Sequence, residues 1–313
     1  MATIFDFFDA LSYSFIQRSL LTAILLSIYC GIIGCFVILK RQVFLVDGIA
    51  HSAFAGGALA ILIGINPWIS IGSFGVGSAL LMGFVEEKGK IQNDAAIGIV
   101  FAFTMALAII FRSMLPQYTN NIDALLFGSI ATVSMEELLI LIIVGLISLV
   151  MIYIIKKELF FVIFDEELAK ANGLPVKKLN YLFLIISSLI IMISIKIVGV
   201  ILLLAVIVTP AASAYQFTFK FNKMIIISIL ISVLGAIFGY FLSFILEISA
   251  SASIVSILTI LFLLSYSISP KRRAHKPSIN EEYCETCRKI RNINVKCNFC
   301  EDSDHLHNEH QTE

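Results

Sequence analysis

Charged residues are scarce in this sequence, and those present cancel. Of 313 residues, 14% are charged and 59% are hydrophobic, and 22 basic residues balance 22 acidic ones. A chain without a basic field is not expected to bind nucleic acid, because phosphate contacts need clustered Lys and Arg. The apolar excess is instead typical of a helical membrane protein, whose surface is solvated by lipid.

Sequence signals for secretion and for catalysis are also missing. The N-terminal stretch MATIFDFFDALSYSFIQRS has acids and aromatics where a cleavable signal has a basic n-region. No phosphate loop occurs, because the only Gly-Lys pair, Gly89-Lys90, is followed by Ile91. No plausible Ser/His/Asp or Cys/His set lies in the apolar part. The chain is therefore not predicted to be an enzyme, and any energy from ATP must come from a partner.

Apolar runs recur along the chain at about the 20-residue length that crosses a bilayer as a helix. They lie at 20–39, 42–65, 67–85, 95–112, 137–155, 181–195, 197–215, 224–245 and 251–268. The stretch 181–215 fits either two short spans that meet at Lys196 or one span and a broken helix. Ser134 and Glu137 form a capping-box pattern that should open the fifth span. We predict an all-α, polytopic integral membrane helical bundle with eight or nine transmembrane helices.

The runs divide the chain into three regions: an amphipathic N-terminal segment 1–18, a transmembrane domain 19–270 and a tail 271–313. Within the domain, 156–180 is the longest internal loop. With nine spans, the basic connections all fall on one side, which the positive-inside rule assigns to the cytoplasm. We expect a multi-pass protein of the cell membrane, the inner or plasma membrane, that contacts lipid and has a cytoplasmic C-terminus.

The stretch LVDGIAHSAFAGG, residues 45–57, keeps two ionisable residues inside an apolar run. Each costs at least ~2.5 kcal/mol in hydrocarbon. Asp47 and His51 stand four residues apart, so a helix presents both on one face about 6 Å apart. They form a partial shell for Mn, Fe or Zn, which must stay incomplete if the ion is to pass on. The structural alternative is that Asp47 caps the helix and His51 bonds a neighbouring backbone.

Four of the six cysteines and four of the five histidines follow Pro270. Cys284, Cys287, Cys297 and Cys300 form two C-x2-C pairs, CETC and CNFC. Four thiolates at this spacing can hold zinc in a tetrahedron. The tail is therefore predicted to be a small cytoplasmic zinc-knuckle-like unit with a structural or regulatory role.

Three motifs in the apolar part are similar to those of one transporter family. They are KRQVFLVDGIAHSAFAGGALAILIG, LLFGSIATVSMEEL, and FDEELAKANGLPVKKLNYLFL followed by IKIVGVILLLAVIVTPAASAY. They resemble the metal-transport permeases of ABC importers, the manganese, zinc and iron family called ABC-3. The collinear resemblance covers residues 15–270, and the tail departs from the family pattern because most members end before it.

The resemblance implies the membrane permease subunit of an ATP-driven importer that moves a divalent transition metal (zinc, manganese or iron) into the cytoplasm. Its partners would be a second copy of the chain, a cytoplasmic ATP-binding subunit and an extracytoplasmic metal-binding protein. The resemblance also implies that Asp47 and His51 line the path of the transported metal. The residues that it assigns to a coupling helix resting on the ATPase are Asp165, Glu166, Ala169 and Gly173.

Two other functions stay open on the sequence. A gradient-driven secondary metal transporter would use Asp47 and His51 as a proton-linked site and would need no ATPase. A membrane-anchored metal sensor would use the tail as its output and would keep metal uptake after a change at Asp47. The cargo stays open as well, because one Asp and one His accommodate manganese, iron or zinc about equally.

Overall fold

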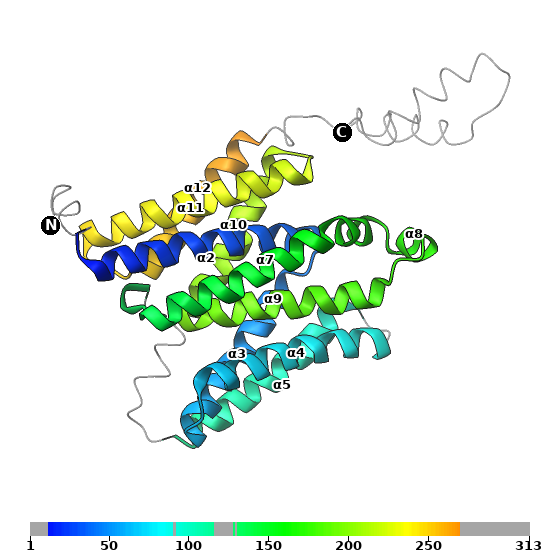
Figure 1. Ribbon diagram of the computed structural model, residues 1–313, viewed down its shortest axis with the longest axis horizontal. Helices are drawn as coiled ribbons and strands as arrows, with labels where there is room; N and C mark the ends of the chain where they lie inside the picture. Colours follow the sequence, from blue (N-terminus) through cyan, green and yellow to red (C-terminus); the bar gives the residue numbers. More distant parts are fainter. Residues whose placement is uncertain (1–11, 90–91, 116–127, 129, 270–313) are drawn as a thin grey trace, which may run out of the picture. The chain divides into compact units, whose positions relative to one another are not determined.

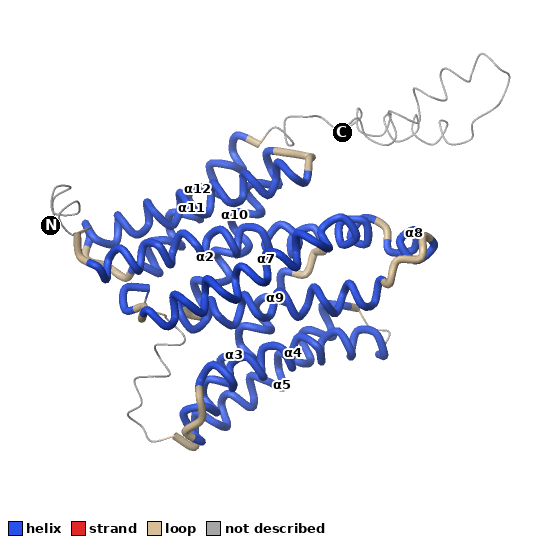
Figure 2. Tube along the Cα trace, viewed as in Figure 1, coloured by secondary structure: helices blue, strands red, loops and turns tan. Residues whose placement is uncertain are grey.

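The computed structural model describes residues 12–89, 92–115, 128 and 130–269, and these residues form helices without a strand (Figure 1; Figure 2). The elements are α2 (Ser14–Leu39), α3 (Val43–Ile63), α4 (Pro67–Gly89), α5 (Asn93–Ser113), the 3-10 turn η1 (Ile130–Thr132), α7 (Met135–Phe164), α8 (Glu166–Ala171), α9 (Val176–Val198), α10 (Val200–Phe217), α11 (Phe221–Leu246) and α12 (Ala250–Ile268). They belong to one compact unit that ends at Ile268. The prediction of an all-α fold is confirmed for these residues.

Eight helices of the described chain are long and apolar enough to cross a membrane: α2, α3, α4, α5, α7, α9, α11 and α12. Eight or nine transmembrane helices were predicted, and α10 is the helix that decides between the two counts. Its apolar part, Leu202–Phe217, is shorter than the eight candidate spans. α10 follows Gly199, whose φ of 83° favours glycine. The chain is therefore a multi-pass helical membrane protein, and the break predicted near Lys196 lies at Gly199.

The connections between helices gather at two ends of the helical unit. One end, here called the α8 end, holds α8 with the last turn of α4 and the first turn of α9 (right in Figure 1). Lys40 follows α2 there, and Phe221 at the start of α11 packs on Phe36 of α2 and Phe160 of α7. As far as the structure describes them, the predicted basic connections that follow α2, α4, α7 and α10 therefore meet at the α8 end.

Helix α7 starts where the sequence predicts and ends later. Ser134 and Glu137 form the predicted capping box: Glu137 N donates to Ser134 Oγ (3.2 Å) and Ser134 N donates to Glu137 Oε2 (3.0 Å). The helix then continues beyond its apolar run 137–155 to Phe164. The predicted loop 156–180 is consequently helical in most of its length, and α7 and α9 are joined by α8 and short turns.

Small residues, among them Gly31 and Gly34 of α2, allow close approach between helices. A Cβ atom at Gly34 would overlap the backbone oxygen of Ile207 in α10. Ser228 Oγ of α11 donates to the Gly31 oxygen at 2.9 Å. Such contacts replace the hydrophobic driving force that helices lack inside lipid. They hold α2 against both α10 and α11.

The replacement Gly34→Ala is expected to destabilise the protein by about 1–3 kcal/mol, because overpacking would push α2 away from α10. Gly77→Ala in α4 is the matched control, since a Cβ atom there has no neighbour within 4 Å. That control should be neutral or slightly stabilising, because Ala favours a helix by up to about 1 kcal/mol over Gly. The measurement is the midpoint of thermal unfolding in detergent. Equal midpoints for the two variants would contradict the close contact.

Candidate functional site

Asp47 and His51 lie one turn apart on α3, and their side chains meet. His51 Nε2 is 3.4 Å from Asp47 Oδ1. The Asp47 side chain is 35% exposed and that of His51 is 22% exposed, so the pair opens onto the surface of the single chain. His51 lies about 12 Å along α3 from Val43 at 1.5 Å per residue. The structure therefore brings the two residues together well inside a candidate membrane span.

The surroundings of the pair do not fit the alternative in which Asp47 caps α3 and His51 bonds a neighbouring backbone. Gln42 is the N-cap residue of α3, so Asp47 does not cap the helix. His51 Nδ1 is buried and has no hydrogen-bond partner among the described residues. The imidazole packs edge-to-face against Phe101 of α5, with ring centroids 5.2 Å apart. Within the described residues, Nδ1 of His51 therefore has no hydrogen-bond partner, and Nε2 is the ring nitrogen that faces Asp47.

The position of α3 beside the pair is fixed by buried hydroxyls. Ser52 Oγ, adjacent to His51, donates to Thr104 Oγ1 of α5 at 2.9 Å and contacts the Gly48 oxygen at 2.7 Å. Ser52 is fully buried and Thr104 is 5% exposed. Buried hydroxyls that are paired in this way orient a helix without leaving an unsatisfied group. Ser52 therefore has a structural role next to the polar pair.

Two side chains alone do not complete a metal shell. Within the described ranges, no group of three or more His, Cys, Asp or Glu residues is placed to hold a metal ion. A divalent first-row metal usually takes four or more ligands. Asp47 and His51 can therefore bind such an ion only together with water or with groups from another molecule, which suits transient binding better than storage.

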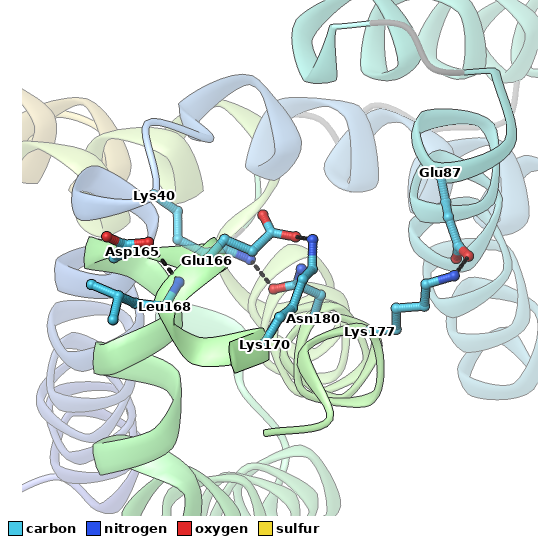
Figure 3. Close-up of polar contacts among 8 residues, drawn as sticks. All are labelled: Lys40, Glu87, Asp165, Glu166, Leu168, Lys170, Lys177 and Asn180. Atoms are coloured by element: carbon cyan, nitrogen blue, oxygen red, sulfur yellow. Dashed lines mark hydrogen bonds and ion pairs between the residues drawn. The ribbon is translucent and has the colours of Figure 1, made fainter. Parts of the chain in front are cut away.

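The predicted coupling segment forms α8, a helix of six residues (Figure 3). Asp165 is its N-cap: the Leu168 backbone N donates to Asp165 Oδ1 at 2.8 Å. Glu166 pairs with Lys170 at 2.8 Å. Gly173, with φ of 79°, supplies the left-handed residue after the helix. Asp165 and Gly173 thus shape the ends of α8.

Ala169 faces the interior of the protein. It is fully buried in a small apolar cluster with Val162 of α7 and with Val176 and Leu179 of α9. A larger side chain at this position would separate α8 from the two helices that carry it. Of the four residues assigned to coupling, Ala169 therefore anchors α8 and does not face outward.

Two apolar side chains at α8 and at the end of α7 face outward, and neither belongs to the four residues assigned to coupling. Leu168 is 52% exposed and Phe164, the last residue of α7, is 66% exposed. Neither side chain is among the site residues predicted from the sequence. The signal was a leucine between acidic and basic residues in FDEELAK, where a solvated helix has no need of one.

The last turn of α4 is tied to the first turn of α9 beside α8. Lys177 Nζ donates to Glu87 Oε1 (Figure 3), and Tyr181 donates from its hydroxyl to Glu87 Oε2 at 3.1 Å. These groups, with Lys40, Gln42 and Glu166 among others, line a polar cavity of about 280 Å³. The α8 end is therefore charged and hollow, in contrast to the apolar core.

The opposite end of the unit carries another polar contact. Lys196 Nζ of α9 lies 3.5 Å from Glu137 Oε1 of α7 and 4.7 Å from the centre of the Trp68 ring of α4. Both charged side chains are about one-fifth exposed. This cluster links three helices, and its members are too far apart in sequence for a local pattern to predict the pairing.

The predicted zinc ligands Cys284, Cys287, Cys297 and Cys300 lie outside the described residues. So does the whole of the tail 271–313 and most of the N-terminal segment 1–18.

The helices and the polar pair define a multi-pass membrane protein with a carboxylate and an imidazole in contact inside a candidate span. The sequence model of the ABC 3 transport family matches residues 12–269. The chain therefore belongs to the ABC 3 transport family and is a membrane permease of that family.

Named relatives share most of the chain. The manganese transport system membrane protein MntC of Listeria monocytogenes is 35% identical over 262 residues, 84% of this chain and 93% of that protein. The manganese import system permease protein ScaB of Streptococcus gordonii is 34% identical, over 85% of this chain and 96% of that protein. The solved structure of PsaBC from Streptococcus pneumoniae in complex with Fab contains a chain 33% identical to this one. The TM-score is 0.78, with 88% of this chain and 99% of that chain covered.

Proposed function

We propose that this permease moves manganese, as the preferred divalent transition metal, into the cytoplasm in an ATP-driven importer. The observation that carries the proposal is the Asp47–His51 pair: two side chains able to ligate a metal meet inside a candidate span, with His51 Nε2 3.4 Å from Asp47 Oδ1. The names of relatives such as MntC and ScaB support manganese as cargo. A carboxylate and an imidazole also suit Mn²⁺, and equally iron or zinc.

The proposal includes a second copy of the chain. The pair is exposed on the single chain and supplies only two ligands, so a symmetric partner would both cover it and add two more. An ion between the copies would exchange part of its water for these ligands and leave when the copies separate. An extracytoplasmic metal-binding protein would deliver it.

The energy would come from an ATP-binding subunit docked at the α8 end. The positive-inside rule supports a cytoplasmic position for this end, because Lys40, Lys170 and Lys177 meet there. Within the coupling segment, Asp165, Glu166 and Gly173 would shape and orient α8, and Ala169 would anchor it. Leu168 would make the apolar contact with the ATPase. The C-terminus, which follows α12, would then also be cytoplasmic.

The cysteine-rich tail remains a separate proposal that rests on sequence spacing. Cys284, Cys287, Cys297 and Cys300 would hold one zinc ion in a small structural or regulatory unit after residue 270. Zinc in this tail would be distinct from the transported metal, because thiolates prefer zinc and the path ligands are oxygen and nitrogen.

The test is uptake of radioactive Mn²⁺ into proteoliposomes that contain the permease and its ATP-binding subunit, with the extracytoplasmic metal-binding protein supplied together with the Mn²⁺. We expect uptake with ATP and Mg²⁺, none with a non-hydrolysable ATP analogue, and no loss on addition of a protonophore. A secondary transporter would give the reverse: uptake without the ATPase, abolished by the protonophore. Parallel measurements with Zn²⁺ and Fe²⁺ establish the metal preference.

A further inference from the structure

Lys40 occupies the short connection between α2 and α3 and reaches the first turns of α9. Its Nζ donates to Asn180 Oδ1 at 3.0 Å (Figure 3). The same atom lies 4.9 Å from the centre of the Phe183 ring. Phe183 is fully buried. The ammonium is thus held by one polar and one aromatic group of α9, the helix that directly follows α8.

Two carboxylates from other elements act on the same ammonium. Burial lowers the pKa of Lys40 to about 8, while the nearby charges of Glu86 in α4 and Glu166 in α8 act to raise it. The Lys40 ammonium therefore donates to Asn180 of α9 and lies in the field of carboxylates on α4 and α8. Glu166 belongs to the helix proposed to meet the ATPase.

The backbone after Lys40 forms a short, hydrogen-bonded turn that leads directly into α3. Lys40 N donates to the Phe36 oxygen at 2.9 Å, and Gln42 N donates to the Val37 oxygen at 3.1 Å. Between them, Arg41 has φ of 57°, a left-handed conformation that is uncommon outside glycine. α3 begins immediately afterwards at Val43. A displacement of this tight turn would therefore move the start of α3.

The polar cavity beside α8 gives the turn room to move. It measures about 280 Å³, and Lys40 and Gln42 both line it. Gln42 is 6% exposed, and its Oε1 is buried with no hydrogen-bond partner among the described residues. Lys40 has donors to spare, so Gln42 supplies a further acceptor in the cavity if the contacts to α8 and α9 change.

We propose that Lys40 is a positioning residue that transmits movement of α8 to α3, the helix of Asp47 and His51. This inference rests on the proposed function, because it takes α8 as the helix moved by the ATPase. Lys40 touches neither the ion nor ATP. It acts by holding the α2–α3 turn to Asn180, beside the cavity that Glu86 of α4 and Glu166 of α8 also line.

The experiment compares Mn²⁺ uptake and ATP hydrolysis by the reconstituted permease–ATPase complex, with Lys40→Met, Lys40→Arg and Lys223→Met. Lys223, an exposed lysine near the start of α11, is the matched control. We expect Lys40→Met to retain the ATPase subunit and its hydrolysis but to lower uptake per ATP about 10-fold, within the range of measured coupling between sites. Lys40→Arg keeps the charge and should restore most of the coupling, and Lys223→Met should match the wild type.

The outcomes separate this inference from the proposed function. Wild-type uptake per ATP in Lys40→Met would overturn the role of Lys40 and leave the importer intact. Loss of the ATPase subunit from the Lys40→Met complex would also overturn it, because Lys40 would then be needed for assembly. A wild-type complex without ATP-dependent uptake would refute the proposed function and the role of Lys40 with it.

Discussion

The replacement Asp47→Asn is expected to lower Mn²⁺ uptake about 10- to 100-fold, the size of effect expected when one interaction with a charged group is lost. Asn keeps the shape of the side chain and removes the negative charge that a divalent cation requires. Because Asp47 does not cap α3, the helix should form as before. His51→Ala should have a similar effect, since it removes the imidazole whose Nε2 faces Asp47.

Asp94→Asn is the matched control for this change. Asp94 is an exposed acid in the first turn of α5, away from the polar pair in sequence. Uptake should stay at the wild-type level in that variant, and both variants should retain the wild-type yield in the membrane. Wild-type uptake by Asp47→Asn would mean that the ion passes elsewhere and that the pair has a packing role.

The course of the helices could be predicted from apolar runs because lipid leaves a spanning chain few alternatives to a helix. The capping box of Ser134 and Glu137 was predicted for the same local reason, since both hydrogen bonds lie within one turn. The meeting of Asp47 and His51 also follows from a spacing of four residues. Local patterns were therefore sufficient for these features.

The end of α7 could not be predicted in the same way. Hydropathy falls at Lys156 and Lys157, yet the helix continues to Phe164. Charged residues are good helix formers in water, so a drop in hydropathy marks where the chain leaves the hydrocarbon and not where the helix ends. The predicted loop 156–180 was too long for this reason.

Contacts between segments that are distant in the chain could not be predicted from the sequence alone. Lys196 was predicted only as a residue at a span end, and its contact with Glu137 depends on how α7 and α9 pack. The packing of helices also determines that Ala169 faces inward and Leu168 faces outward. Six residues of α8 are too few to display a periodic apolar face, so its orientation depends on the helices on which it rests.

The replacement Leu168→Asp is expected to weaken binding of the ATP-binding subunit by about 30-fold or more, because burying a carboxylate at an apolar contact removes at least ~2 kcal/mol. Leu168 is 52% exposed in the single chain, so the change leaves the interior of the permease as it is. The measurement is the affinity of the purified permease for its ATPase in detergent or nanodiscs. Leu168→Ala should give a smaller loss, since it removes contact area without adding a charge.

Phe219→Asp tests whether this effect is specific to α8. Phe219 is 82% exposed in the connection between α10 and α11, at the same end of the unit. Introducing Asp there changes surface charge and apolar exposure in the same way, and we expect ATPase affinity to remain within a factor of about two. Equal losses in the two variants would place the ATPase across the whole α8 end, whereas a loss confined to Leu168→Asp would identify α8 as the docking helix. Undiminished affinity in Leu168→Asp would exclude Leu168 from the interface and require another surface for the ATPase.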